Sequence, residues 1–376
     1  MSLQLIELIK LIRLTKPVTP RWLRLAEGDR MGSENLKTGG VPPKSEATVD
    51  LSIICVNWNS VEYLLECIPS IYEHTLGISF EIIVVDNASP QGDVGLLKER
   101  FRDITLIRSK ENLGFAGANN LGVRHAKGEC VVFLNPDTKL VSPALTTMLR
   151  ALRTLPDAGV VGCKLLNGDL SIQTSCIMVY PTILNQLVQA EYLRLRWPNL
   201  WGIGPLFSDD PAPARVEAIS GACMLMRRQA FENVGMFSED YFMYAEDLDL
   251  CYKVERSGLS NYYVGGATIV HYAGKSSAPE WQTIMKLRSE VRFCAKNYGP
   301  WYGSAFRFAM GFNAIARLLL IAVISIFRRG SQQRATLKSA GLKWRATIKA
   351  LISPAFSSKY PTNEPKSTPK LYESNV

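Results

Sequence analysis

The sequence of 376 residues has no Cys-x-x-Cys pair and no cluster of cysteines and histidines with the spacing of a zinc site. It has only three histidines, and most of its eight cysteines lie in apolar runs. These absences exclude a structural zinc module. We therefore expect reduced, buried thiols in a cytoplasmic protein.

The sequence also lacks the two familiar glycine-rich phosphate loops. The segment Asn112–Gly122, NLGFAGANNLG, has no Gly-Lys-Ser/Thr ending and is therefore not a Walker A loop. It follows the third expected strand and contains no Gly-x-Gly-x-x-Gly, so it is not a dinucleotide fingerprint either. The segment is typical of a turn and helix start, and its glycines would let the backbone approach a ligand closely.

A clean apolar run of the roughly 20 residues that cross a membrane is missing as well. The first residues, MSLQLIELIKLIRLTKP, interleave charged with apolar side chains, which favours an amphipathic helix over a secretory signal peptide. Near the other end Leu318–Phe327 is apolar, but Asn313 and Arg317 interrupt the segment before it. We expect a helix lying in the membrane interface. A buried structural helix and a transmembrane span remain alternatives.

The net charge is +9 and the isoelectric point about 9.1. Lysine and arginine concentrate in the first thirty residues and in 328–349, which indicates an anionic partner for the ends of the chain. A basic-aromatic module for nucleic acid is absent, so acidic lipid fits better. We divide the chain into an amphipathic helix and flexible tether (1–48), an ordered domain (49–300) and a membrane-associating helical and basic tail (301–376).

In the ordered domain, apolar strand segments alternate four times with helical segments. The strands are nearly continuous apolar runs, as in CVVFLNPDT, which predicts an α/β fold of the Rossmann-like kind. Its sheet should be mostly parallel, with helices on both faces. Ser142 before Pro143 predicts the N-cap of the fourth helix.

Polar residues follow these strands where each one ends. In an open α/β sheet, ligands bind at the carboxyl ends of the strands. Asn57, Asp86 and Arg108 could bind a nucleoside there, and Asp137 is well placed to hold a divalent cation with two phosphates. This clustering favours a nucleoside diphosphate ligand.

A second acidic cluster, AEDLDLCYK, begins an expected helix and follows the aromatic residues of DYFMY. Its acids could simply stabilise the helix dipole. A carboxylate in an aromatic-walled pocket could instead accept a proton from an attacking hydroxyl. His271 ends an apolar strand; it is either a polar strand end or, if it faces Asp137, part of a metal site.

Seven segments in this order resemble the inverting family 2 glycosyltransferases of the GT-A fold, and within them the rhamnosyltransferase-like branch. The resemblance covers roughly Leu51 to Ser277 and leaves out both ends. The segments are SIICVNWNS, IIVVDNAS, NLGFAGANNLG, FLNPDT, SGACMLMRRQAFENVGMF, FMYAEDLDLCYKVERSG and IVHYAGKSS.

The resemblance implies a nucleotide-sugar donor, a divalent cation (Mg²⁺ or Mn²⁺) and a single in-line displacement by a hexosyltransferase-class enzyme. By position, Asp247 of the Glu246–Asp247 pair would be the base. Asp137 would be the last acid of the metal motif, whose first acid is replaced by Asn135, and this puts a two-carboxylate site in doubt. The remaining assignments are Asn57 and Asp86 on the nucleobase and ribose, Asn112, Gly114 and Asn119 lining the nucleotide pocket, and His271 on the metal or diphosphate.

We expect dTDP-rhamnose as donor, with a UDP-hexose as the alternative. The acceptor would be a glycan or lipid-linked intermediate of cell-surface polysaccharide synthesis, at the inner face of the cytoplasmic membrane. Two other classes of protein fit the sequence less well. A nucleotidyltransferase would carry a basic glycine-rich loop after the first strand, where NWNSVEYL stands. A non-catalytic sugar-binding scaffold would not need Asp137, Asp247 and His271 together.

Overall fold

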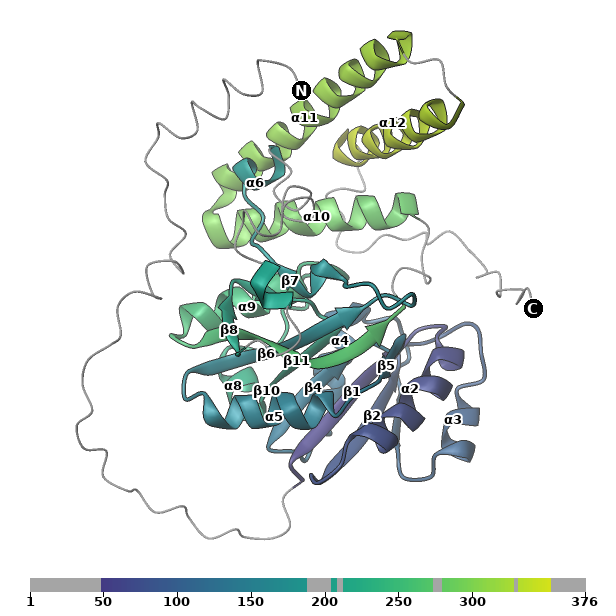
Figure 1. The fold of residues 1–376 in the computed structure, drawn as a ribbon, viewed down its shortest axis with the longest axis vertical. Helices are drawn as coiled ribbons and strands as arrows, with labels where there is room; N and C mark the ends of the chain where they lie inside the picture. The colour runs from purple at the N-terminus through teal and green to yellow at the C-terminus, as the bar shows by residue number, and fades with distance from the viewer. Residues whose placement is uncertain (1–48, 188–203, 208–211, 273–278, 328–330, 353–376) are drawn as a thin grey trace, which may run out of the picture. The chain divides into compact units, whose positions relative to one another are not determined.

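The computed structural model describes residues 49–187, 204–207, 212–272, 279–327 and 331–352 (Figure 1). The expected N-terminal helix and tether, and the end of the basic tail, lie outside these ranges. The first half alternates strands and helices as predicted. Its elements are β1 (Leu51–Asn57), α2 (Val61–His74), β2 (Phe80–Asp86), α3 (Gly95–Arg100), β3 (Thr105–Arg108), α4 (Gly114–Val123), β4 (Cys130–Leu134), β5 (Thr138–Leu140) and α5 (Ala144–Thr154).

The second half has shorter strands and longer helices. Its elements are β6 (Ala158–Leu166), β7 (Ile177–Met178), α6 (Ile183–Leu187), β8 (Ala214–Val216), β9 (Ala218–Ile219), β10 (Cys223–Arg227), α8 (Arg228–Asn233), α9 (Glu246–Arg256), β11 (Ser260–His271), α10 (Pro279–Tyr298), α11 (Pro300–Phe327) and α12 (Ser331–Ile352). The predicted strand ending at His271 is therefore confirmed.

The strands form one nine-stranded sheet in the order β3-β2-β1-β4-β10-β6-β11-β5, with β8 beside β11. β10 is antiparallel to both β4 and β6, and β11 is parallel to β6. It follows that β1, β2, β3, β4, β6 and β11 all point the same way. The sheet is mostly parallel, as the sequence predicts.

Helices cover both faces of this sheet. Ile54 and Phe133 are register partners on one face. Ile54 lies under Gly122 of α4, and the ring centroids of Phe133 and Phe231 of α8 are 4.8 Å apart in a tilted arrangement. The neighbouring residues point to the other face, where the Cys223 thiol lies 3.9 Å from Met148 of α5. All eight cysteines are buried, and none of them is paired, which agrees with the expected buried thiols.

The carboxyl ends of the parallel strands meet at one edge. Asn57, Asp86 and Arg108 are register partners across β1, β2 and β3. His271, the last residue of β11, pairs with Thr138 of β5, directly after Asp137. The strand ends that carry the predicted site residues therefore share this edge.

One local prediction is wrong. The residue before α5 is Pro143, and Ser142 does not cap the helix. The Ser142 hydroxyl instead donates to the backbone oxygen of Thr268 in β11 at 2.9 Å. The start of the helix is thereby fixed to the sheet rather than to its own N–H groups.

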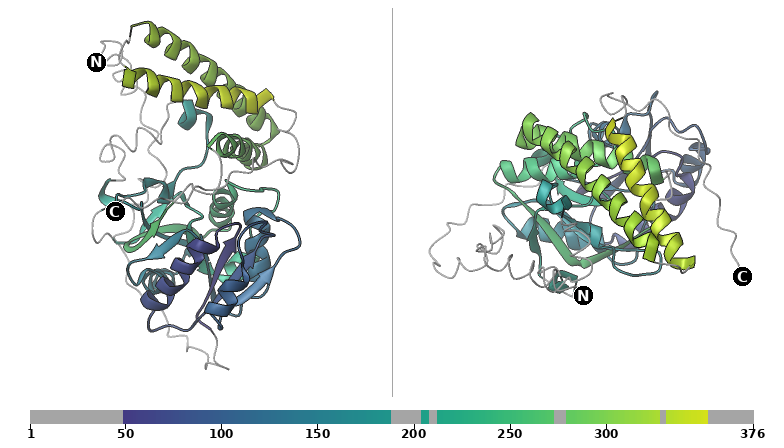
Figure 2. Two further views of the ribbon diagram at one scale, coloured as in Figure 1. Left: turned by 90° about the vertical axis from the view of Figure 1, so that its right-hand side faces the viewer. Right: turned by 90° about the horizontal axis from the view of Figure 1, so that it is seen from above.

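The three C-terminal helices pack against one another, and Figure 2 shows α11 and α12 side by side in both views. Over Pro300–Ser325, α11 is long and apolar enough to cross a membrane by length and composition, and only 17% of its most apolar window is buried. Asn313 is buried, and Arg317 lies over the ring of Trp344 in α12. The two residues that interrupt the apolar run in sequence therefore face α12.

Candidate active site

Asp86 ends β2 at the donor side of the expected site. Its carboxylate is buried and accepts a hydrogen bond from the Asn57 side chain at 2.8 Å. Asn57 is fully buried; its amide also donates to Ser89, and its oxygen accepts from the Ser60 N–H. The structure thus places Asn57 as the group that orients Asp86.

The next residue after Asp86, Asn87, begins a network of hydrogen bonds between amide side chains and the loop before α4. Asn87 donates to the side-chain oxygen of Asn112 at 2.9 Å and to the backbone oxygen of Gly114. Its own oxygen accepts from the Leu113 N–H, and that of Asn112 accepts from the Gly114 N–H. The loop before α4 is therefore held to the end of β2 by side chains.

Gly114 permits a close backbone approach between this loop and the segment before α9. Its φ is +71°, and a Cβ added to it would lie 2.3 Å from the backbone oxygen of Phe242. The next residue, Phe115, donates its N–H to that same oxygen at 2.9 Å. Only glycine satisfies both demands, the left-handed φ and the missing side chain.

The Phe242 segment carries two strained residues. Tyr244 and Ala245 have φ of +68° and +63°, and Glu246 begins α9 directly afterwards. Non-glycine residues in this region cost about 1 to 3 kcal/mol each and persist where the surroundings determine them. The backbone that leads into the acidic cluster is therefore fixed in an unfavourable conformation.

Asp137 and His271 lie together at the edge formed by β5 and β11. His271 Nε2 is 3.3 Å from Asp137 Oδ1 and 3.3 Å from the Asn135 side-chain nitrogen. On its other side, His271 Nδ1 lies 2.9 Å from Gln173 Oε1, and Gln173 Nε2 donates to the His271 backbone oxygen. An N–H on Nδ1 donating to Gln173 would leave Nε2 as a lone pair aimed at Asp137.

This pair fits a divalent cation as part of its ligand set. Two neighbouring ligands with bonds of about 2.1 Å lie about 3 Å apart, close to the observed separation. Among the residues that the structure describes, no group of three or more His, Cys, Asp or Glu side chains is arranged so that it could hold a metal ion. The Asp137–His271 pair would therefore supply only part of the ligands, and oxygens of the donor or water could supply others.

Asp247 lies in the first turn of α9, where two backbone N–H groups hold its carboxylate. Gly221 donates to Oδ2 at 2.9 Å and Leu248 to Oδ1 at 2.8 Å. Burial raises the pKa of Asp247 above its ordinary value, against these two N–H groups and the nearby Lys286 charge, which lower it. Each oxygen keeps a second lone pair, so the carboxylate can still accept a proton.

The two neighbouring acids differ from Asp247. Burial and the nearby Asp247 charge raise the pKa of Glu246 far above its ordinary value, and its Oε2 meets no hydrogen-bond partner among the described side chains and backbone. Asp249 is fully buried and accepts from Ser238 at 2.5 Å, Asn297 at 3.1 Å and Lys296 at 3.0 Å. Asp249 thus joins α9 to α10.

One short loop, 220–222, forms hydrogen bonds with both the strand end that carries Asn135 and Asp137 and the side chain of Asp247. Gly221 donates to Asp247, and the next residue, Ala222, accepts the Asn135 N–H at 3.0 Å. A Cβ on Gly221 would lie 3.3 Å from the Asp247 carboxylate, so the contact is tight. The loop 220–222 therefore contacts both the Asp247 carboxylate and the backbone of Asn135, two residues before Asp137.

Most of the predicted residues lie at the edge of the sheet or in the loops beside it. Arg108 and Asn119 are the two whose side chains are less well placed to bind a ligand. Arg108 is exposed at the end of β3, and Asn119 is buried and donates to Phe115 within its own helix. Gln173 and Gly221 were not predicted. A glutamine on a loop carries no motif, and Gly221 has only its place before β10.

The comparisons with known proteins agree with this architecture. Residues 52–235 match the family model described as Glycosyl transferase family 2. The N-acetylglucosaminyl-diphospho-decaprenol L-rhamnosyltransferase of Mycobacterium tuberculosis is 27% identical over 68% of this chain and 87% of its own length. The uncharacterized protein y4gI of Sinorhizobium fredii is 27% identical over 67% of this chain, which spans only 28% of that longer protein.

Among solved structures, the mannosyltransferase PcManGT from Pyrobaculum calidifontis, in complex with GDP-Man and Mn²⁺, superimposes with a TM-score of 0.50. The match covers 84% of this chain and 91% of the other, at 19% sequence identity, and supports the fold alone.

The fold and the sequence matches together identify a glycosyltransferase with the GT-A fold. More particularly, residues 52–235 match glycosyl transferase family 2, and the chain is similar to rhamnosyltransferases of that kind, such as the M. tuberculosis relative.

Proposed function

We propose that this enzyme transfers a sugar, with inversion, from a nucleotide-sugar donor to a hydroxyl of a lipid-linked glycan in cell-surface polysaccharide synthesis. The donor we favour is dTDP-rhamnose. The similarity to the N-acetylglucosaminyl-diphospho-decaprenol L-rhamnosyltransferase of M. tuberculosis supports a rhamnosyl donor and a polyprenol-linked acceptor. A UDP-hexose is the alternative.

The observation that carries the proposal is the junction at 220–222. It links the Asp137–His271 pair, separated by 3.3 Å, to the carboxylate of Asp247. A donor diphosphate at the pair would bring its sugar next to a positioned base. Attack from the face opposite the diphosphate then gives inversion.

Asp247 would take the proton of the acceptor hydroxyl. Its raised pKa makes it a better proton acceptor than an exposed aspartate, and the Gly221 and Leu248 N–H groups fix its orientation. Glu246, buried beside it, would remain protonated and limit the negative charge at the site. Of the Glu246–Asp247 pair, Asp247 is thus the residue that can carry the negative charge.

On the donor side, Asp86 would bind the nucleoside with Asn57 behind it, and Arg108 would reach the site from the end of β3. The loop before α4 would supply the wall of the nucleotide pocket. Its residues in this role are Asn112, Gly114 and Asn119.

Asp137 and His271 would hold a divalent cation, Mg²⁺ or Mn²⁺, with Gln173 fixing the histidine ring. When bound, the cation would neutralise charge that gathers on the departing nucleoside diphosphate. With one carboxylate and one imidazole from the protein, binding of the cation should depend strongly on the donor phosphates.

We place the enzyme at the cytoplasmic face of the membrane, attached through α11. Trp301, Phe308, Phe312, Ile315, Leu319 and Val323 form an exposed apolar stripe, which we call the α11 stripe. Their spacing puts them on one helix face, opposite the buried Phe306 and Met310. The adjacent α12 has basic but no acidic residues, which suits anionic lipid.

A donor panel tests the proposal. Thermal shift and donor hydrolysis would be measured with Mn²⁺ for dTDP-rhamnose, UDP-glucose and GDP-mannose. We expect the largest stabilisation and hydrolysis with dTDP-rhamnose, and none of either with Asp137→Ala. Equal response to all three donors, or a response independent of Asp137, would contradict the donor assignment or the metal assignment respectively.

A further inference from the structure

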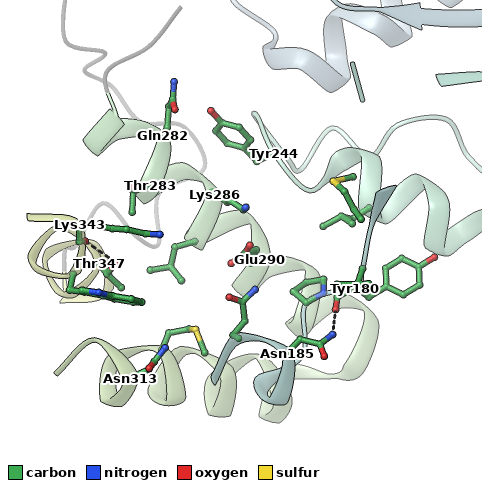
Figure 3. Close-up of a pocket in the computed structure, with 18 of the residues that line it drawn as sticks. Tyr180, Asn185, Tyr244, Gln282, Thr283, Lys286, Glu290, Asn313, Lys343 and Thr347 are labelled. Carbon is green, nitrogen blue, oxygen red and sulfur yellow. Dashed lines mark hydrogen bonds between the residues drawn. The ribbon is translucent and has the colours of Figure 1, made fainter. Parts of the chain in front are cut away.

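A cavity of about 680 Å³ lies between the catalytic domain and the three C-terminal helices (Figure 3). Tyr244 and Leu248 contribute to its wall from the segment around the start of α9. Lys286, Met310 and Lys343 contribute from α10, α11 and α12 respectively. This volume is within the range of about 300 to 1,000 Å³ that ligand sites occupy.

The cavity is lined by basic side chains together with aromatic and apolar ones. Lys286 and Lys343 bring two ammonium groups from different helices, and Figure 3 shows both side chains directed into the space between the helices. Glu290 is the acid among the lining residues, and Trp344 adds an aromatic surface. Burial raises the pKa of Tyr244 to about 12, so its hydroxyl stays protonated and can donate.

The cavity lies between the proposed base and the helix that carries the α11 stripe. Leu248 follows Asp247, whose pKa the Lys286 charge lowers, so that lysine lies near the proposed base. On the far side, Met310 and Asn313 of α11 line the cavity, while Phe308 and Phe312 of the α11 stripe are exposed. One helix therefore presents one face to the cavity and the opposite face to the outside.

We propose that this cavity binds the phosphate or diphosphate group of a lipid-linked acceptor, clamped between Lys286 and Lys343, with the lipid chain running along the apolar residues of α11 and α12. The inference rests on the proposed function, because it assigns the acceptor of that reaction. The acceptor sugar would then extend towards Asp247.

The test uses the full-length protein and three probes: farnesyl diphosphate, farnesol and inorganic pyrophosphate. Binding would be measured by calorimetry in EDTA, so that a cation at the donor site cannot recruit the probes. We expect Lys343→Gln to weaken farnesyl diphosphate binding at least tenfold and Lys343→Arg to restore most of it. Farnesol should bind weakly and equally to all variants.

Lys338→Gln is the matched control, since it removes the same charge from an exposed position of the same helix. It should leave farnesyl diphosphate affinity unchanged. Equal affinity of wild type and Lys343→Gln would overturn the site. Pyrophosphate binding as tight as farnesyl diphosphate, with the same dependence on Lys343, would overturn the lipid-linked assignment in favour of free phosphate.

Donor hydrolysis without acceptor, measured on the same proteins, separates this inference from the proposed function. A wild type that binds farnesyl diphosphate through Lys343 but hydrolyses no nucleotide sugar would reject the proposed function and keep the cavity. A wild type that hydrolyses its donor but binds farnesyl diphosphate independently of Lys343 would do the reverse.

Discussion

At the scale of single residues, the acidic cluster at the start of α9 shows three fates for similar side chains. Asp249 is buried among Ser238, Lys296 and Asn297. Glu246 is buried with its Oε2 atom unpartnered among the described residues, and Asp247 is held by backbone N–H groups. Their environments, rather than their types, separate a structural link from a candidate base. The sequence could predict the cluster but not this division.

Asp247→Asn should reduce turnover by about 10² to 10⁴-fold, the usual contribution of a general base. The amide keeps the size of the side chain, so donor affinity should stay within about threefold. Turnover with acceptor and donor binding by calorimetry would measure the two effects. Glu246→Gln is the matched comparison; a larger loss there than in Asp247→Asn would transfer the role of base to Glu246.

Lys286→Gln should move the acid limb of the pH–rate profile to higher pH. The base must be ionised to act, so turnover falls as pH drops through its pKa. The Lys286 charge lowers the pKa of Asp247, and its removal would therefore raise that pKa. The limb would be read from turnover at saturating acceptor. Lys343→Gln loses the same charge in the same cavity and should leave the limb in place; a limb unmoved by Lys286→Gln would contradict Asp247 as the titrating base.

Gln173→Ala should weaken Mn²⁺-dependent nucleoside diphosphate binding about 10 to 100-fold, as expected when a group that orients a metal-binding histidine is removed. Gln173 contacts both the ring and the backbone oxygen of His271. Calorimetry with and without Mn²⁺ would report this loss. Gln229→Ala, exposed on α8, is the control. Metal-dependent binding that survives Gln173→Ala unchanged would mean that His271 is not a ligand.

At the scale of elements, close contacts between loops place the site. The loop before α4 meets the segment before α9 through Gly114 and the Phe242 carbonyl, and the loop 220–222 meets both β4 and α9. The sequence predicts the strands well, because buried parallel strands read as apolar runs. It cannot predict contacts such as that of Ser142 with Thr268, which depend on which strand lies beside the helix.

Gly114→Ala should destabilise the fold by about 1 to 3 kcal/mol and lower donor affinity, because the φ of +71° and the Phe242 carbonyl both exclude a methyl group. Urea unfolding and donor binding would measure these effects. Gly341→Ala is the control: a Cβ there meets no atom of the described residues within 4 Å, and α12 should gain slightly from alanine. A Gly114→Ala protein as stable as wild type would show that this backbone can relax.

At the scale of the whole molecule, the C-terminal helices show that the order of residues along the chain does not reveal which helix face each residue occupies. Asn313 and Arg317 break the apolar run in sequence, yet on the helix they lie towards α12, where Arg317 covers Trp344. The α11 stripe is therefore uninterrupted by charge. Helical periodicity, read over the full 28 residues of α11, separates these two faces.

The stripe predicts how the enzyme meets its substrate. Phe308 and Phe312 are 78% and 66% exposed, so replacing both with glutamate should cost little stability while placing two charges in the lipid-facing surface. The wild type should co-sediment with vesicles that contain phosphatidylglycerol, and the double variant should remain in the supernatant. Turnover of a short soluble acceptor should persist, because neither residue lines the cavity.

Leu76→Glu is the matched control, since Leu76 is 68% exposed and lies just after the end of α2 in the catalytic domain, outside the α11 stripe. It should sediment with vesicles as the wild type does. If Phe308→Glu with Phe312→Glu also sediments normally, α11 is not the attachment surface. Extraction of the wild type by carbonate at high pH further separates the two membrane arrangements: a helix lying in the interface is released, whereas one that crosses the bilayer is retained. Release is expected here, because α11 contacts α10 and α12, and its buried residues Phe306, Met310 and Asn313 lie opposite the stripe.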